Sequence, residues 1–301
     1  MTRRLLSLIV LISVIAIAAV FVLIPPYVKI YRQVKVYTPE QAVIKYVMHT
    51  KKWSNWLPNA NRKFIVQKST ISEITGRLLT GNDTAESTVG YAVRDGRTIY
   101  LTWNAVVRTG VNPLKRVLLY QSRNNVVRRI DSILANAKQF LEDDRQVYGI
   151  HVQNAKIEDS IVLATKRMSK SALPLEEVYK AIKELRAYAV KTKADKAGYP
   201  MMNVTQLNTK AYLTTLAIPI NKPVSSNNDF FIKKLVYNAN LLTVNVKGGN
   251  SRIKTALNQL SLYMLDNGYT SPAIPYEELV TDRVQTPDSS KWITRICYPV
   301  L

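Results

Sequence analysis

The hydrophobic and polar positions of this chain divide it into three segments with different periods. The first is an apolar run at residues 5 to 24, LLSLIVLISVIAIAAVFVLI, which contains no charged residue. Twenty such residues in a helix are enough to cross the roughly 30 Å hydrocarbon core of a bilayer. The proline pair PP follows at once and ends the run. The pattern predicts a transmembrane anchor over residues 1–26.

A cleaved signal peptide is the alternative explanation of this run. Signal peptides have apolar cores of about 7 to 15 residues and a cleavage site with small residues, whereas VLIPPY offers no such site. We therefore expect a single-pass protein of the cell membrane. Basic residues nearly balance across the run, so the positive-inside rule orients it weakly; they are Arg3 and Arg4 before it and Lys29, Arg32 and Lys35 after it. We expect the soluble domains on the extracytoplasmic side.

The second segment changes from a helical period to alternation and back. A helix is expected to open at Thr38-Pro39-Glu40, and it is followed by alternating runs in which Asp95-Gly96 predicts a hairpin turn. The stretch NNVVRRIDSILANAKQFLEDDRQVYG then places apolar residues on one helical stripe: Val126, Ile130, Ile133, Ala137 and Phe140. The order predicts an antiparallel sheet gripped by a long helix.

This order, with WSNWLP at the end of the first helix, resembles the SRPBCC family, the START and polyketide-cyclase-like helix-grip fold. The resemblance implies a helix-grip domain over residues 31–150 with a hydrophobic tunnel for a lipid-like or aromatic ligand. Its expected cavity residues are Trp53, Trp56 and Trp103. The same three tryptophans would serve equally as plain core filling.

The third segment contains a repeat. YLTTLAIPI, residues 212–220, matches WITRICYPV, residues 292–300, in its aromatic, aliphatic, Thr and Pro positions. Each copy follows a strand-like run, a helix-period run and a Gly-Tyr turn. The pattern predicts a pseudo-twofold α+β domain with half-repeats at 157–220 and 240–301. Ligand pockets favour such internal interfaces, so we expect a cleft between the halves.

The phrases PYEELVTDR and KWITRICYPV in this segment resemble the GyrI-like family of effector-binding domains, over residues 157–301. The resemblance implies a cleft lined by aromatic residues with one acid, which falls on Glu277. Glu277 and Glu278 would point to opposite faces of a strand. Arg295 should lie on the face opposite Trp292. The expected ligand-binding residues are Glu277, Tyr276, Trp292, Tyr199, Tyr212 and Tyr298.

Charge adds one question. The chain has 42 Lys and Arg against 21 Asp and Glu, a formal net charge of +21, which is typical of nucleic-acid-binding proteins. The cations are scattered, however, and no helix-turn-helix segment precedes the repeat. We expect no nucleic-acid partner, because attraction of anionic lipid beside the anchor accounts for the charge as well.

Cysteine and histidine usage limits the chemistry. Cys297 is the only cysteine, and His49 and His151 are the only histidines. One cysteine cannot form an intrachain disulfide, and this set cannot supply a zinc site with several Cys or His ligands. We expect no metal and no cofactor.

Two functions stay open. The first is a membrane-tethered binding protein for lipophilic or aromatic ligands, cationic ones included, held in the cleft, the helix-grip cavity or both. The second is a small-molecule hydrolase in which Glu277 activates water. The pattern assigns no second carboxylate to the cleft, and hydrolysis ordinarily uses an acid and a base.

Overall fold

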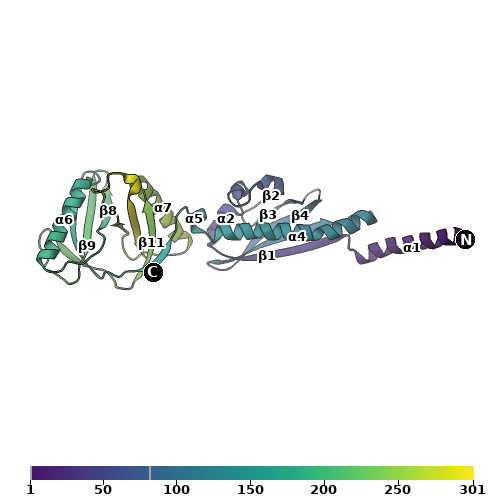
Figure 1. The fold of residues 1–301 in the computed structure, drawn as a ribbon, viewed down its shortest axis with the longest axis horizontal. Coiled ribbons are helices and arrows are strands. Elements are labelled where there is room, and N and C mark those ends of the chain that lie inside the picture. Colours follow the sequence, from purple (N-terminus) through teal and green to yellow (C-terminus); the bar gives the residue numbers. More distant parts are fainter. Residues whose placement is uncertain (1, 81–82) are drawn as a thin grey trace. The chain divides into compact units, whose positions relative to one another are not determined.

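The computed structural model describes residues 2–80 and 83–301 (Figure 1). The chain divides into two compact units, Met1–Val147 and Tyr148–Leu301. Each unit is built from antiparallel strands and helices, so the fold class is α+β, as the patterning predicts.

Unit 1 begins with helix α1, Thr2–Leu23. Its apolar part, Leu5–Leu23, has a mean hydropathy of 3.1 and is not buried by the rest of the structure. The end of α1 is bonded to the sheet domain, because Arg116 donates to the Ile24 carbonyl and Thr109 to the Pro25 carbonyl. With its 19-residue apolar stretch, α1 is long and apolar enough to span a membrane.

The sheet of unit 1 has five strands in the order β1-β5-β4-β3-β2, all antiparallel. The expected Asp95-Gly96 hairpin turn is confirmed, since the Asp95 carboxylate accepts from the amides of Arg97 and Thr98. The strands are β1 Tyr27–Tyr37, β2 Phe64–Ser69, β3 Glu73–Thr80, β4 Asp83–Asp95 and β5 Thr98–Arg108.

The long helix of unit 1, α4 Pro113–Leu141, packs against β1, β3 and β5. All five residues of its predicted apolar stripe are buried. The helix begins well before the predicted stretch, because Asn112 caps it: the Asn112 side chain accepts from the amides of Leu114 and Lys115. The shorter helices are α2 Glu40–Tyr46, η1 Thr50–Asn55, α3 Ala60–Lys63 and α5 Asp144–Val147.

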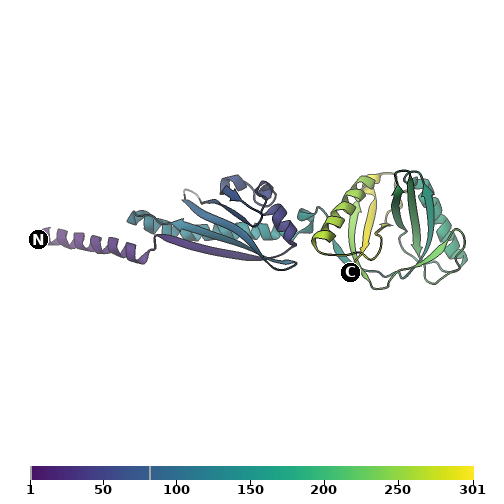
Figure 2. The same cartoon turned by 180° about the vertical axis from the view of Figure 1, so that it is seen from behind.

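Unit 2 is one eight-stranded sheet in the order β10-β7-β9-β8-β12-β13-β11-β6. Two 17-residue helices pack on it, α6 Leu175–Lys191 and α7 Asn250–Asp266, and Figure 2 shows the strands between them. Its other elements are β6 Gln153–Lys156, β7 Ile161–Ser169, β8 Met201–Asn208, β9 Ala211–Pro219, β10 Phe231–Lys234, β11 Asn240–Lys247, β12 Tyr276–Leu279, η2 Ser289–Lys291 and β13 Ile293–Pro299.

The strand register shows the internal duplication directly. Thr214 of β9 pairs with Arg167 of β7, and Thr294 of β13 pairs with Val246 of β11. Five residues farther along β9 and β13, the prolines of the two copies keep this relation, since Pro219 pairs with Val162 and Pro299 with Leu241. The repeated motif is therefore the same strand used twice, with the same neighbour in each half.

The leading strand of each half pairs with the other half. β6 precedes β7 in the chain but pairs with β11, and β10 precedes β11 but pairs with β7. The two halves therefore exchange their edge strands. At each edge of the continuous sheet, the outermost strand comes from the half that occupies the other side.

Candidate functional site

The register places Glu277 at the centre of the duplicated sheet. Val204 pairs with Thr214, and Leu279 pairs with Thr294, so Val204 of β8 and Leu279 of β12 are counterparts. Two positions before them stand Met202 and Glu277, which pair with each other. When a residue pairs with its own counterpart, the pseudo-twofold axis passes between the two. The first-half counterpart of Glu277, which the sequence pattern leaves unassigned, is therefore Met202.

Strand alternation around this axis creates two different sites. Glu277 lines a groove on the face that carries α6 and α7, and its neighbours Tyr276 and Glu278 line a larger chamber on the opposite face. The alternation of side chains along β12 accounts for the division, because successive residues of a strand point to opposite faces.

The helix-face groove has a volume of about 230 Å³. Its lining combines a polar end, formed by Glu277, Arg283 and Trp292, with aliphatic residues of both helices, of the loop before α6 and of β8. The aliphatic residues are Leu173, Leu175, Val178, Met202, Val204, Ile253 and Leu257.

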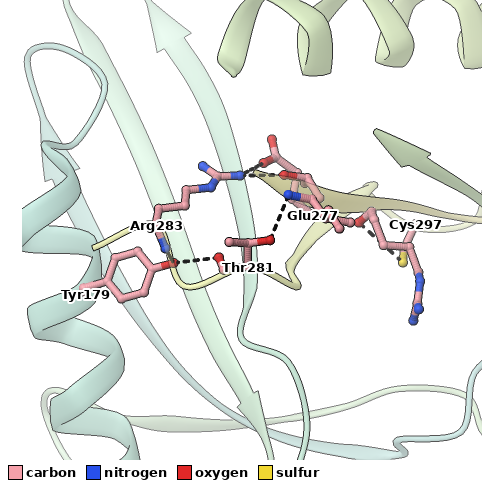
Figure 3. A network of polar contacts seen from close by, with 8 residues as sticks. Tyr179, Glu277, Thr281, Arg283 and Cys297 are labelled. Atoms are coloured by element: carbon pink, nitrogen blue, oxygen red, sulfur yellow. Dashed lines mark hydrogen bonds and ion pairs between the residues drawn. The ribbon is translucent and has the colours of Figure 1, made fainter. Parts of the chain in front are cut away.

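Arg283 organises the polar end of the groove (Figure 3). Its side chain is 5% exposed, and its Nη2 donates to the Thr294 hydroxyl at 2.8 Å and lies 3.5 Å from the Glu277 carboxylate. The guanidinium carbon stands 4.9 Å from the centre of the Trp292 ring. The Arg283 amide donates to the Tyr179 hydroxyl, so main chain and side chain are both fixed. The sequence pattern does not single out Arg283.

Burial raises the pKa of the Glu277 carboxyl, and the charge of Arg283 opposes that rise. Desolvation therefore shifts the pKa of Glu277 more strongly than the ion pair with Arg283 does. A single acid with a raised pKa suits a general base, but no other carboxylate of the described residues lines the groove. The arginine also offsets the negative charge that would attract a cation.

The opposite-face chamber has a volume of about 860 Å³. Its walls are the segment 153–159, the turn 196–199 and the strands β8, β11, β12 and β13. Cavities of 300–1,000 Å³ are the size that holds organic ligands. The chamber therefore has room for a molecule that the helix-face groove could not enclose.

Ion pairs and buried polar groups line this chamber. Glu278 and Arg295 form an ion pair at 2.9 Å, and Lys196 and Asp159 form another at 2.5 Å. The Arg295 guanidinium lies 5.8 Å from the ring centre of Tyr199. The charges of these acids are thus compensated within the wall.

Burial also raises the pKa of Tyr276 and of Cys297, which line the chamber together. The Cys297 side chain is fully buried. A raised pKa keeps a thiol protonated at neutral pH, and the thiolate is the nucleophilic form. Cys297 is therefore a packing and hydrogen-bonding group of the wall.

The structure does not bring the six expected cleft residues into one site. Glu277 and Trp292 lie in the groove, and Tyr276 and Tyr199 lie in the chamber on the other face. Tyr212 and Tyr298 line neither of these two spaces. Arg295 faces the chamber and Trp292 the groove, as strand alternation predicts. No motif marks the contacts of Arg283, since they depend on the loop after β12 folding back.

The three tryptophans of unit 1 form a buried aromatic cluster. Trp53 packs against Trp56 and Phe64, and Phe64 packs against Trp103, with ring centres 5.2 to 5.5 Å apart. Trp53 and Trp56 donate their indole N–H groups to the carbonyls of Val47 and Tyr46. These contacts favour the core-filling role of the tryptophans over the ligand-binding one.

No family model and no curated protein matches the chain. Among solved structures, the chain is similar to a cryo-EM structure of an EcmrR–DNA complex, with 16% identity over 64% of this chain and 72% of that one and a TM-score of 0.43. It is similar to the crystal structure of the EcmrR C-terminal domain, with 16% identity over 50% of this chain and 98% of that one and a TM-score of 0.41. A START superfamily protein from Mycobacterium smegmatis matches with 11% identity over 36% of this chain and 98% of that one, at a TM-score of 0.23. At these identities the likeness concerns the fold alone.

Proposed function

We propose that unit 2 is a small-molecule binding domain whose ligand occupies the opposite-face chamber. The observation that carries the proposal is the chamber volume of about 860 Å³ behind Tyr276 and Tyr199. Aromatic rings and the aliphatic residues Met201, Leu235 and Leu241 would hold an apolar body. Side-chain amides of the walls would hydrogen-bond its polar groups.

The charges of the chamber indicate the ligand class. Its lining has three acids, Glu158, Asp159 and Glu278, and three cations, Lys156, Lys196 and Arg295, so it offers no excess negative charge to a lipophilic cation. We therefore favour a neutral, lipophilic or aromatic ligand over a cationic one. Cationic binding stays a prediction that a ligand screen decides.

We further propose that α1 tethers both units to a membrane. The support is the 19-residue apolar span of α1 and the exposure of three apolar residues next to its end: Val111, Leu114 and Leu118 are 87%, 77% and 64% exposed. Lys115, which is exposed, lies among them. Apolar and basic side chains together are typical of a surface that meets anionic lipid. The side of the membrane stays a prediction.

A hydrolase that uses Glu277 is the second candidate. The raised pKa of Glu277 supports it, while Arg283 and the lack of another acid among the described residues of the groove lining weigh against it. Turnover of an ester by the wild type, abolished in Glu277→Gln, would establish this activity. We therefore rank the hydrolase below the binding protein.

A thermal-shift screen of the full chain in detergent tests the binding proposal. Water-soluble aromatic compounds, neutral and cationic, should include neutral ones that raise the melting temperature of unit 2. Tyr199→Ala, which removes a chamber wall, should reduce the shift. Tyr237→Ala is the matched control, because Tyr237 is exposed and lies outside the chamber. Equal shifts in both variants would contradict the chamber as the site.

A further inference from the structure

The helix-face groove has a chemistry of its own. It lies where both helices of unit 2 begin: Leu175 and Val178 come from the first turn of α6, and Asn250 and Ile253 come from the first turn of α7. Helix N-termini carry partial positive charge and favour anions. The duplication therefore brings two such ends to one small groove.

The charged side chains of the groove add to this field. Arg283 and Lys254 are cationic, and Glu277 is the single acid that the described residues contribute to the lining. The first turn of α6 also holds the exposed acids Glu176 and Glu177, whereas the first turn of α7 holds no acid. The lining thus carries one more cation than anion, and Lys254 is the cation that α7 itself contributes.

Arg283 has hydrogen-bonding capacity left over. Its Nε is buried and finds no acceptor in the described parts of the chain, where its side-chain bonds are made by Nη2. A buried donor without an acceptor costs about 1–3 kcal/mol, and more when it is charged. A ligand oxygen would remove part of this cost.

The duplication identifies a second such atom. Thr294 accepts a hydrogen bond from Arg283, and its first-half counterpart, Thr214, lines the same groove. The Thr214 hydroxyl is fully buried and has no partner among residues 2–80 and 83–301. The first half has a methionine, Met202, at the axial position and leaves its threonine unbonded.

We propose that this groove is a second ligand site, separate from the chamber, which binds a small organic monocarboxylate. The carboxylate would lie against Arg283 and Lys254, near the Thr214 hydroxyl. Its aliphatic or aromatic body would contact Leu173, Val178 and Leu257. A volume of about 230 Å³ restricts the ligand to a single ring or a short chain, since it is below the size of drug-like sites.

Isothermal titration calorimetry on the full chain in detergent tests this site with three matched probes: phenylacetate, neutral phenylacetamide and cationic phenethylammonium. Phenylacetate should bind at least tenfold more tightly than the other two. Lys254→Gln, at an exposed position, should weaken phenylacetate binding severalfold. Lys183→Gln is the control, since it removes a cation from α6 outside the groove.

Four further variants have defined expected outcomes. Glu277→Gln should tighten phenylacetate binding, because it removes the competing carboxylate, and Arg283→Gln should weaken it at least tenfold. Thr214→Val should raise the melting temperature of the free protein and weaken phenylacetate binding, because the unpartnered hydroxyl is lost. Tyr199→Ala should leave phenylacetate binding unchanged, which separates this site from the chamber.

Two results would overturn the inference. One is equal affinity for phenylacetate and phenylacetamide in the wild type. The other is preference for phenethylammonium that Glu277→Gln abolishes, since the groove would then be a cation site. Lys254 is exposed, so Lys254→Gln should fold normally. This variant tests the site even if Arg283→Gln does not fold.

Discussion

At the scale of single residues, burial decides how the paired acids on β12 behave. Glu277 and Glu278 each have an arginine partner, yet burial is the larger influence and raises the pKa of both. An exposed ion pair would lower the pKa of its acid instead. These two carboxylates are therefore held in place at a cost in free energy, which is typical of binding sites.

This cost predicts a pH dependence for Glu278. Its pKa in the folded protein is above the ordinary 4.5, so the folded state binds the proton more tightly than the unfolded state. Protonated Glu278 contributes to the free energy of unfolding at low pH. This contribution is lost as pH rises from about the ordinary pKa through the pKa in the folded protein. Glu278→Gln keeps a neutral group throughout, so its stability relative to the wild type should rise with pH across that window.

Urea unfolding of both proteins at several pH values measures this difference. Glu176→Gln removes the same charge from an exposed position of α6 and is the control. A relative stability of Glu278→Gln that falls as pH rises would show that the Arg295 pair, and not burial, controls this carboxyl.

At the scale of elements, a side-chain cap sets where α4 begins, and the edge pairings of unit 2 position a wall of the chamber. The long helix α4 begins at Pro113 because Asn112 satisfies two of its first amides. In unit 2, β6 and β10 exchange between the halves, so each half covers one edge of the other. The segment that leads out of β6, up to Asp159, also forms a wall of the chamber.

The cap on α4 predicts a defined loss. Asn112→Ala should lower the free energy of unfolding of unit 1 by about 1 kcal/mol, because the amides of Leu114 and Lys115 lose their acceptor. Tryptophan fluorescence follows this transition, since three of the four tryptophans lie in unit 1. Asn124→Ala, at an exposed mid-helix position, is the control and should not destabilise unit 1. Equal losses in the two variants would show that the cap contributes nothing.

At the scale of the whole molecule, unit 1 begins with the apolar helix α1, and each of the two units has its own core. The exposed apolar residues next to the end of α1 belong to α4 and to the loop before it. Their exposure is costly in water and favourable at a lipid surface. Under the proposal that α1 spans a membrane, the first unit would also touch the lipid surface.

This arrangement predicts how the chain behaves without its first helix. Residues 28–301 should be soluble and should unfold cooperatively. Their sedimentation with anionic vesicles should be weak, and Leu114→Ser together with Leu118→Ser should reduce it further. The same substitutions made at Leu262 and Leu265, which are exposed on α7 of unit 2, are the control. Aggregation of residues 28–301 alongside a well-behaved full chain would contradict the independence of the soluble units.

The order of amino acids alone specifies the periodic features of this protein: the apolar run of α1, the stripe of α4, the hairpin at Asp95-Gly96 and the repeated strand motif. Such features are local, because helix and strand periods and turn residues depend on adjacent positions. Alternation along a strand likewise assigns Glu277 and Glu278 to opposite faces, and Trp292 and Arg295 as well.

Which residues share a site depends instead on how distant strands and loops meet. The sequence predicts Tyr276 and Trp292 in one cleft, but they belong to opposite faces of the sheet, and strand pairing sets the faces. The Met202–Glu277 axis depends on the pairing of β8 with β12, two strands that are far apart in the chain. The contact of Arg283 with Glu277 depends on a loop that folds back over its own strand. Neither contact is periodic, so no pattern along the chain indicates it.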